Sequence, residues 1–256
     1  MVSSSHLRAC VGELDQFERG LQRSLDSLHN KLRKAIDEQR RFEADASHEL
    51  RTPVAGLRAR LEEAQLNPGE VDLDKLLERA LGDVKRLQSI IDDLHLLSQV
   101  EAAGRPAGPV PVDLAEFVQA EVSRRDHKHE VTVKGERGVV VTAVPPRLGR
   151  LLGELLDNAQ RHARSLVRVD VRRAGGLGEL VVCDDGPGIP PHERERVFDR
   201  FARLDTARSR DRGGSGLGLA IVWKIAEAHG GDVHAEEAPG GGGVFVVRLP
   251  LARTAR

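Results

Sequence analysis

The sequence predicts a multidomain chain in which long helices form a dimeric four-helix bundle and an α/β sandwich follows. Apolar residues recur at alternating spacings of three and four over much of residues 11–94, which is typical of amphipathic helices that pack together. Beyond the Gly/Pro/Ala-rich segment 101–111, short β-rich runs alternate with helical patterns. The class is therefore all-α first and α/β second.

Composition excludes several classes of function. The 256 residues carry 31% charged and 39% hydrophobic side chains, with a net charge of −1, which gives no electrostatic reason to expect nucleic acid or an anionic membrane as partner. Cys10 and Cys183 are the only cysteines and suit a reducing compartment. No apolar run approaches the roughly 18 residues of a membrane span, and residues 1–7 do not resemble a signal peptide. We expect a cytoplasmic chain, or the soluble part of a longer membrane-anchored protein.

The first helical pattern predicts a coiled coil between subunits. Residues 1–6 are expected to be disordered, and a heptad begins at Val11. Glu18 and Gln39 are polar exceptions on its seam, and the flanking faces are almost wholly polar. The seam residues are Val11, Leu14, Leu21, Leu25, Leu28, Leu32, Ala35 and Phe42. The alternative is a single amphipathic helix that folds onto its own domain.

Two further helices form a predicted hairpin. The second helix ends at Leu66, where Asn67, Pro68 and Gly69 mark a turn. Its seam is Leu50, Val54, Leu57, Leu61 and Ala64, and that of the third helix is Leu73, Leu77, Ala80, Val84, Leu87, Ile91 and Leu94. Because one hairpin cannot bury its apolar face alone, two hairpins should pair into a four-helix bundle, which makes the protein a homodimer.

The first two seams differ in phase. Continuing the first heptad predicts apolar residues at 46, 49, 53 and 56, whereas the observed seam runs through 46, 50, 54 and 57. This slip of one residue requires local rewinding, and Pro53 removes a helical hydrogen bond. Our hypothesis is that the segment is bistable, so that a twist arriving through residues 11–40 repositions His48.

The remainder predicts an α/β sandwich with helices on one face of a mixed sheet. The segment 185–214 is expected to be irregular. Helices are predicted at 113–125, 146–163 and 216–229, and strands at 131–134, 139–142, 166–173, 179–183, 232–237 and 244–249.

Residues 42–53 centre on His48, with Glu49 directly after it and Thr52 four residues on. A lone histidine on a helix is most often a surface residue. Signals typical of a nucleotide site in the C-terminal half change that interpretation. An exposed, acid-flanked histidine in the same chain as a nucleotide site indicates phosphoryl transfer to the histidine.

The nucleotide signals begin at Asp184, Gly186 and Gly188, which follow an apolar strand. A buried carboxylate at a strand end suits an adenine amine, and glycines allow close backbone approach. The glycines of 214–218, Gly214, Gly216 and Gly218, open a helix whose N–H groups favour phosphate, although such a motif also occurs in simple turns. Arginines between these segments could pair with phosphate or remain solvated. They are Arg200, Arg203, Arg208, Arg210 and Arg212.

One helix upstream carries the predicted metal-binding side chains. Glu154 and Asn158 are four residues apart and share a face. The amide oxygen of Asn158 is a hard ligand suited to Mg²⁺. Arg161 follows one turn later.

With these motifs the chain resembles the sensor histidine kinases of bacterial two-component systems over residues 38–250. S-H-E-L-R-T-P resembles the H box, L-L-D-N-A-Q-R-H-A the N box, D-D-G-P-G-I the G1 box, V-F-D-R-F the F box and G-G-S-G-L-G-L-A-I the G2 box. The resemblance implies a GHKL-type (Bergerat) ATP-binding sandwich. It also implies a signalling helix over 1–37, a dimerisation and phosphotransfer domain over 38–100, the linker 101–111 and a catalytic domain over 112–256.

The resemblance further implies the residue roles. His48 accepts the γ-phosphoryl group, Glu49 acts as general base or orients the ring, and Thr52 positions water for dephosphorylation. Asn158 binds Mg²⁺, and Asp184 contacts the adenine of ATP in a pocket shaped by Gly186 and Gly188. The phosphate contacts implied are Arg161, Arg203, Gly214, Gly216 and Gly218. Phe198 and Phe201 anchor the lid or simply pack in the core. The partner is a response regulator, and the chain would be cytoplasmic or the cytoplasmic portion of an inner-membrane sensor.

Glu154 departs from the family pattern, which often has asparagine there. The glutamate could bind Mg²⁺ through water, or act as a base that favours ATP hydrolysis. Two alternatives to the kinase function stay open: a phosphatase-dominant member of the same fold, and a GHKL ATPase or nucleotide-gated dimeric scaffold without phosphohistidine.

Overall fold

The computed structural model describes residues 4–69, 72–103, 108–202, 215–238 and 241–252. The chain consists of two compact units, residues 1–52 and 53–256. Within the described residues, no helix is both long enough and apolar enough to cross a bilayer.

Helix α1 (Ser4–Leu66) is continuous and carries both of the first two apolar patterns. Residues 4–6 are helical, so the expectation of disorder over residues 1–6 is wrong for these three, and residues 1–3 lie outside the described chain. Helix formation is cooperative, and a long helix therefore extends into polar flanking residues at little cost. Pro53 lies inside the helix, and the helix ends before Asn67 and Pro68, as predicted.

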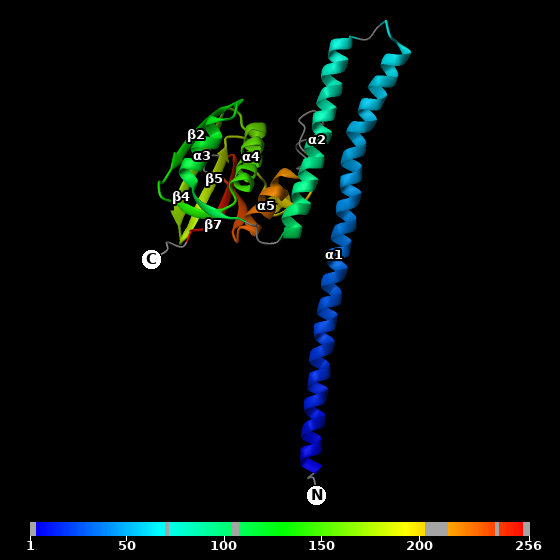
Figure 1. The fold of residues 1–256 in the computed structure, drawn as a ribbon, viewed down its shortest axis with the longest axis vertical. Helices are drawn as coiled ribbons and strands as arrows, with labels where there is room; N and C mark the ends of the chain where they lie inside the picture. The colour runs from blue at the N-terminus through cyan, green and yellow to red at the C-terminus, as the bar shows by residue number, and fades with distance from the viewer. Residues whose placement is uncertain (1–3, 70–71, 104–107, 203–214, 239–240, 253–256) are drawn as a thin grey trace. The chain divides into compact units, whose positions relative to one another are not determined.

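Helix α2 (Leu73–Ala103) completes the predicted hairpin (Figure 1). The backbone N–H of Lys75 donates to Asp72 Oδ1 at 3.2 Å and caps the start of the helix. Across the hairpin, Arg60 of α1 forms an ion pair with Asp83 of α2. The long-range polar contact therefore joins the two helices near the turn.

The predicted linker 101–111 is too long at both ends. Residues 101–103 belong to α2, and β1 (Val110–Asp113) already includes residues 110 and 111. Glu101, Ala102 and Ala103 are good helix formers, which explains the extension. Pro111 is tolerated because, among the described strands, β1 pairs with β3 alone, so the missing N–H falls on an edge strand.

Helix α2 has a buried stripe in addition to its predicted seam. Ile90, Leu97 and Val100 are buried, and so is the carboxylate of Asp93, which is 2% exposed. These residues repeat at spacings of three and four and therefore lie on one face. Helix α2 contacts α5 (Gly218–Ala228), so this second face joins the hairpin to the sandwich within residues 53–256.

The sandwich contains the predicted mixed sheet, with strand order β2-β4-β5-β7-β6. Strand β2 (Glu130–Gly135) is parallel to β4 (Leu166–Ala174), while the other neighbours are antiparallel. The remaining strands of this sheet are β5 (Leu177–Asp184), β6 (Asp232–Glu237) and β7 (Gly243–Pro250). A separate pair joins β1 to β3 (Val140–Ala143). The predicted strands are thus confirmed, with ends that move by a few residues.

Three helices contact the sheet and build the core. They are α3 (Leu114–Ser123), α4 (Pro145–His162) and α5. Alternate strand residues such as Val169, Val182 and Phe245 are fully or almost fully buried, as expected for a sheet whose side chains alternate between faces. Two short 3₁₀ turns, η1 (Pro191–Glu193) and η2 (Arg196–Phe198), lie in the segment predicted to be irregular.

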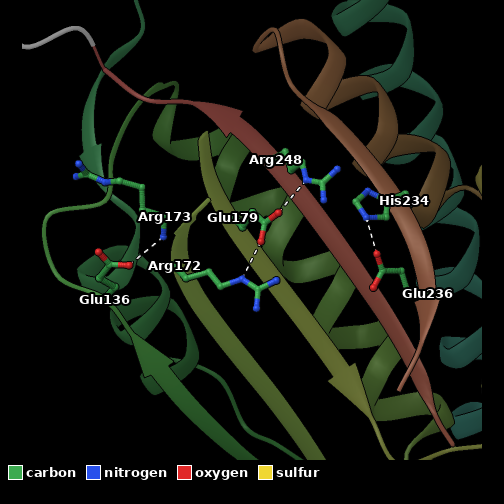
Figure 2. A network of polar contacts seen from close by, with 7 residues as sticks. All are labelled: Glu136, Arg172, Arg173, Glu179, His234, Glu236 and Arg248. Atoms are coloured by element: carbon green, nitrogen blue, oxygen red, sulfur yellow. Dashed lines mark hydrogen bonds and ion pairs between the residues drawn. The ribbon is translucent and has the colours of Figure 1, made fainter. Parts of the chain in front are cut away.

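The strand residues that alternate with these core residues carry a polar network on the other face of the sheet (Figure 2). Glu179 of β5 accepts hydrogen bonds from Arg172 of β4 and Arg248 of β7, each at 2.8 Å. The hydrogen bond from Arg248, followed by that from Arg172, lowers the pKa of Glu179. An open hollow of about 360 Å³ beside this network is lined by residues of β2, β4 and β5 and by Glu136. None of the predicted site residues lines it.

Candidate functional site

The first candidate site is the exposed histidine of α1. His48 has 79% of its side chain exposed, and its Nδ1 lies 4.0 Å from Glu49 Oε1. The hydroxyl of Thr52 donates to the backbone carbonyl of His48 at 3.2 Å. With the carboxylate on the Nδ1 side, Nε2 is the ring nitrogen directed away from Glu49. An imidazole in this setting can act as a nucleophile toward an external group.

Asp184 ends strand β5 and is buried. Its Oδ1 accepts from the backbone N–H groups of Gly186 at 2.9 Å and Gly243 at 3.3 Å. Burial raises the pKa of this carboxyl. Its Oδ2 has no hydrogen bond from any described residue, so one oxygen of a fixed carboxylate is available for a ligand's donor.

Asp185 performs a different task. It accepts from the backbone N–H groups of Arg164 at 2.7 Å and Ser165 at 3.1 Å, and from the Ser165 hydroxyl at 2.7 Å. The hydroxyl bond and then the backbone bonds lower its pKa. Asp185 therefore fixes the connection between α4 and β4 against the end of β5.

The glycines after Asp184 are placed where a side chain would not fit. A Cβ on Gly186 would lie 2.4 Å from the carbonyl oxygen of His162, at the end of α4. Gly188 has φ +76° and faces the backbone of Gly242. The segment is thus close to α4 on one side and to the start of β7 on the other.

The glycines before α5 bring two distant motifs together. Gly216 has φ +73°, and its carbonyl accepts the N–H of Phe201 at 2.8 Å. A Cβ on Gly218 would lie 2.3 Å from Glu154 Oε2, so the start of α5 touches the predicted metal-binding face of α4. Phe198 packs edge-on against Phe245, with centroids 6.1 Å apart, which is a core-packing role.

On α4, Glu154 pairs with Arg150 at 2.7 Å. Burial is the main reason that the pKa of Glu154 rises to about 7. Asn158, one turn later, is half-buried and makes no side-chain hydrogen bond with a described residue. Arg161 is exposed. A carboxylate and an amide oxygen on one face fit an Mg²⁺ ion that keeps most of its waters.

Known proteins match both parts of the chain. Residues 38–103 match the His Kinase A (phospho-acceptor) domain family, and residues 143–253 match the histidine kinase-, DNA gyrase B- and HSP90-like ATPase family. The signal transduction histidine-protein kinase AfsQ2 of Streptomyces coelicolor is 37% identical over 90% of this chain and 46% of its own length. The probable sensor histidine kinase TcrY of Mycobacterium tuberculosis is also 37% identical, over 93% of this chain and 52% of its own length.

The chain belongs to the sensor histidine kinase family. The histidine kinase AdeS of Acinetobacter baumannii shares the fold, with a TM-score of 0.66 and 24% identity over 80% of this chain and 98% of that structure. The chain spans about half the length of the curated relatives it matches. Its sandwich is an ATPase-type domain.

The predicted site residues fall into separate groups. His48, Glu49 and Thr52 belong to the first unit. Asp184, Gly186 and Gly188 lie together at the end of β5, while Glu154 and Gly218 meet at the start of α5. Arg203 and Gly214 lie outside the described residues, as do Arg208, Arg210 and Arg212.

Three polar residues around Glu154 were not identified from the kinase sequence. Asp93 of α2 forms an ion pair with Arg150 and accepts from the Ser215 hydroxyl at 3.1 Å. The spacing of Ile90, Asp93, Leu97 and Val100 could have revealed a second face of α2. No local pattern indicates that this face meets Arg150 and Ser215, since these contacts join segments that are far apart in sequence.

Proposed function

We propose that this protein is an ATP-dependent autokinase that phosphorylates His48 and passes the phosphoryl group to an aspartate of a response regulator. The observation that carries the proposal is the exposed imidazole of His48 beside Glu49 in a chain that also contains an ATPase-type domain. Because ATP is the donor, the reaction belongs in the cytoplasm.

The chemistry needs an in-line nucleophile and neutralised phosphate charge. The neutral form of an imidazole is the nucleophile in such a reaction. Nε2 attacks the γ-phosphorus while the bond from phosphorus to the β,γ-bridging oxygen breaks and ADP leaves. The ring carries its proton on Nδ1, the nitrogen that faces Glu49. The carboxylate of Glu49 stabilises the positive charge that develops on the ring during the attack. In the second step an aspartate oxygen of the regulator attacks the same phosphorus and the histidine is released.

For the nucleotide, we assign the adenine amine to the available Oδ2 of Asp184. We assign Mg²⁺ to Asn158 directly and to Glu154 through water, because Mg²⁺ usually keeps several of its own waters when it binds to a protein. The bound ion would neutralise phosphate charge. Arg161, Arg203 and the glycines of 214–218 are the proposed phosphate contacts. Equal ATP hydrolysis by wild type and Glu154→Asn supports the water-mediated role, whereas slower hydrolysis in the variant would assign Glu154 as a base.

The test of the kinase function is phosphorylation from γ-labelled ATP. We expect an acid-labile, base-stable label that His48→Gln abolishes. The control is His29→Gln, an exposed histidine on the same helix, which should label normally. If wild type acquires no such label while it hydrolyses ATP, the protein is an ATPase without phosphohistidine.

Nucleotide binding has its own test at the two adjacent aspartates. Asp184→Asn should weaken the affinity for ATP at least about tenfold, because an amide donor can face the adenine amine and the buried charge is lost. Asp185→Asn should retain the affinity and lower the melting temperature instead. Equal ATP affinities for Asp184→Asn and wild type would remove Asp184 from the adenine site.

A phosphatase activity toward the regulator is part of the proposal. The relative MprB of Mycolicibacterium smegmatis, 35% identical over 89% of this chain and 48% of its own length, is named a histidine-protein kinase/phosphatase. Thr52 would position the attacking water in this reaction. Thr52→Ala should then slow dephosphorylation of the regulator while His48 still labels, and an unchanged rate would exclude this role.

A further inference from the structure

The buried stripe of α2 contains one charged residue. Asp93 lies between Ile90 and Leu97 on that face and is buried with them. A buried carboxylate is unfavourable unless its oxygens are paired. The two partners of Asp93 both come from the sandwich, so its burial depends on contact between the hairpin and the sandwich.

Each oxygen of Asp93 reaches a different motif. Oδ1 pairs with Arg150, which lies one turn before Glu154 on α4 and also pairs with Glu154 at 2.7 Å. Oδ2 accepts the hydroxyl of Ser215 at 3.1 Å. The Ser215 oxygen in turn accepts the N–H of Leu217 at 3.2 Å, just before α5 begins. The side chain of Asp93 therefore contacts Ser215, in the segment before α5, directly. It reaches Glu154 of the N box through Arg150.

We propose that Asp93 is a positioning residue that latches α2 to the ATP site, and that the latched arrangement has the lower affinity for Mg²⁺ and nucleotide. The proposal rests on the proposed assignment of Glu154 to the metal. In the latched arrangement Asp93 keeps Arg150 against Glu154. Arg150 then occupies a carboxylate oxygen of Glu154 that the hydrated Mg²⁺ ion requires. Without Asp93, Arg150 loses one of its two carboxylate partners, and Glu154 on its own helix is the partner that remains.

The latch also holds Ser215, which lies in the segment directly before α5. Ser215 is bound on one side by Asp93 and on the other by the N–H of Leu217. A phosphate that binds at the start of α5 needs backbone N–H groups of this region. A ligand that prefers the unlatched arrangement shifts the population toward it, and its apparent affinity is reduced by the fraction of molecules that remain latched.

The test compares Asp93→Asn with Asp92→Asn, which removes the same charge from the neighbouring exposed position of α2. The probe is a non-hydrolysable ATP analogue with Mg²⁺, titrated into the full chain. We expect Asp93→Asn to bind at least about fivefold more tightly than wild type, at the lower end of typical coupling between sites. Asp92→Asn should match wild type. Ser215→Ala removes one neutral hydrogen bond and should shift the affinity less, in the same direction.

A purely structural role of Asp93 predicts a different result, since a destabilised site binds nucleotide equally or more weakly. Unchanged or weaker binding by Asp93→Asn would therefore overturn the proposal. Amide hydrogen exchange provides the second readout, and the variant should exchange faster than wild type over residues 88–97 and 215–221. Equal exchange in the two proteins would also overturn the latch.

Failure of the proposed function gives a distinct outcome. If no variant, wild type included, binds the analogue, the nucleotide assignment is wrong, and hydrogen exchange alone then decides whether Asp93 joins α2 to the sandwich. If Asp93→Asn does not fold, as judged by circular dichroism, Ser215→Ala decides between tighter binding, which supports the latch, and unchanged binding, which rejects it.

Discussion

Asp184 and Asp185 are adjacent and of one residue type, yet their pKa values move in opposite directions. Burial raises the pKa of Asp184, whereas hydrogen bonds from Ser165 and its neighbours lower that of Asp185. The sequence D-D-G-P-G-I identifies the pair as a candidate, and the resemblance favours the first aspartate. The hydrogen-bond partners explain why the second serves the fold, because they occupy both of its oxygens.

The protonation state of His229 likewise depends on hydrogen-bond partners that sequence patterns do not reveal. Its Nδ1 lies 2.7 Å from the carbonyl of Ile225, and its Nε2 lies 3.1 Å from the backbone nitrogen of Val144, just before α4. The N–H of Val144 donates to Nε2, so Nδ1 is the protonated nitrogen and the ring is neutral. Burial, followed by the positive charge of Arg147, lowers the pKa of His229.

This arrangement predicts a loss of stability in mild acid. Because the folded-state pKa lies below the unfolded value of about 6.5, the neutral ring contributes its full stabilisation above that value. The contribution is lost as the pH falls below about 6.5 toward the folded-state pKa. We expect the free energy of unfolding, measured with urea at a series of pH values, to fall more steeply in this range for wild type than for His229→Gln. Parallel curves would show that His229 is not responsible.

At the scale of elements, α1 combines two apolar phases in one uninterrupted helix. The helix passes through both the slip around His48 and the proline at position 53. Pro53 has no N–H to donate to the carbonyl of Glu49, and Thr52 donates its hydroxyl to the carbonyl of His48. The backbone hydrogen bonding beside His48 therefore differs from that of a regular helix at the place where the two phases meet.

Our bistability hypothesis predicts that helix phase sets the balance of activities. Deleting Arg40 shifts the upstream seam by one position relative to His48 and should change the ratio of autokinase to phosphatase activity. Deleting residues 22–28, one full heptad, preserves the phase and should leave the ratio unchanged. The measurement is labelling of His48 alongside dephosphorylation of the regulator. An unchanged ratio after the one-residue deletion would count against the hypothesis.

Helix α2 shows how one element can serve two surfaces. Leu77, Val84 and Ile91 are exposed in the single chain, while Ile90, Leu97 and Val100 are buried. The first set repeats on the seam predicted for the bundle, and the second set faces the sandwich. An amphipathic helix usually has a single apolar stripe. The second stripe therefore identifies α2 as the element that connects the helical hairpin to the sandwich.

At the scale of the whole molecule, exposed leucines on both helices support the proposed homodimer. Leu21, Leu25, Leu28 and Leu32 of α1 and Leu77 and Leu81 of α2 are all at least half exposed in the single chain. On each helix separately, exposed leucines that repeat at helical spacing indicate an interaction surface. A second copy with the same stripe can cover it in a four-helix bundle, as expected for a symmetric interface.

If the protein is a dimer, a charged side chain on the predicted apolar seam of α2 should weaken the association of the two chains. Leu77→Glu places a carboxylate in the bundle core, where burial without a partner is costly, and should raise the dimer dissociation constant at least about tenfold. Lys85→Glu, off the predicted seam of the same helix, is the control and should remain dimeric. Light scattering after size-exclusion chromatography over a range of concentrations measures this. A Leu77→Glu protein as dimeric as wild type would place the interface elsewhere.

The sequence by itself determined the order of helices and strands, the hairpin turn and the motifs of the histidine kinase family, because these depend on local periodicity, turn residues and short spacings. It missed β1 (Val110–Asp113), which lies partly in the predicted linker, and it misplaced element ends at residues 4–6 and 101–103. Helix extension and edge pairing override composition at these places. Only the tertiary structure decided which aspartate holds the fold, which histidine is neutral and buried, and which residue of α2 reaches Arg150 and Ser215. Asp93 and Ser215 are 122 residues apart, and the packing of α2 against α5 brings them together.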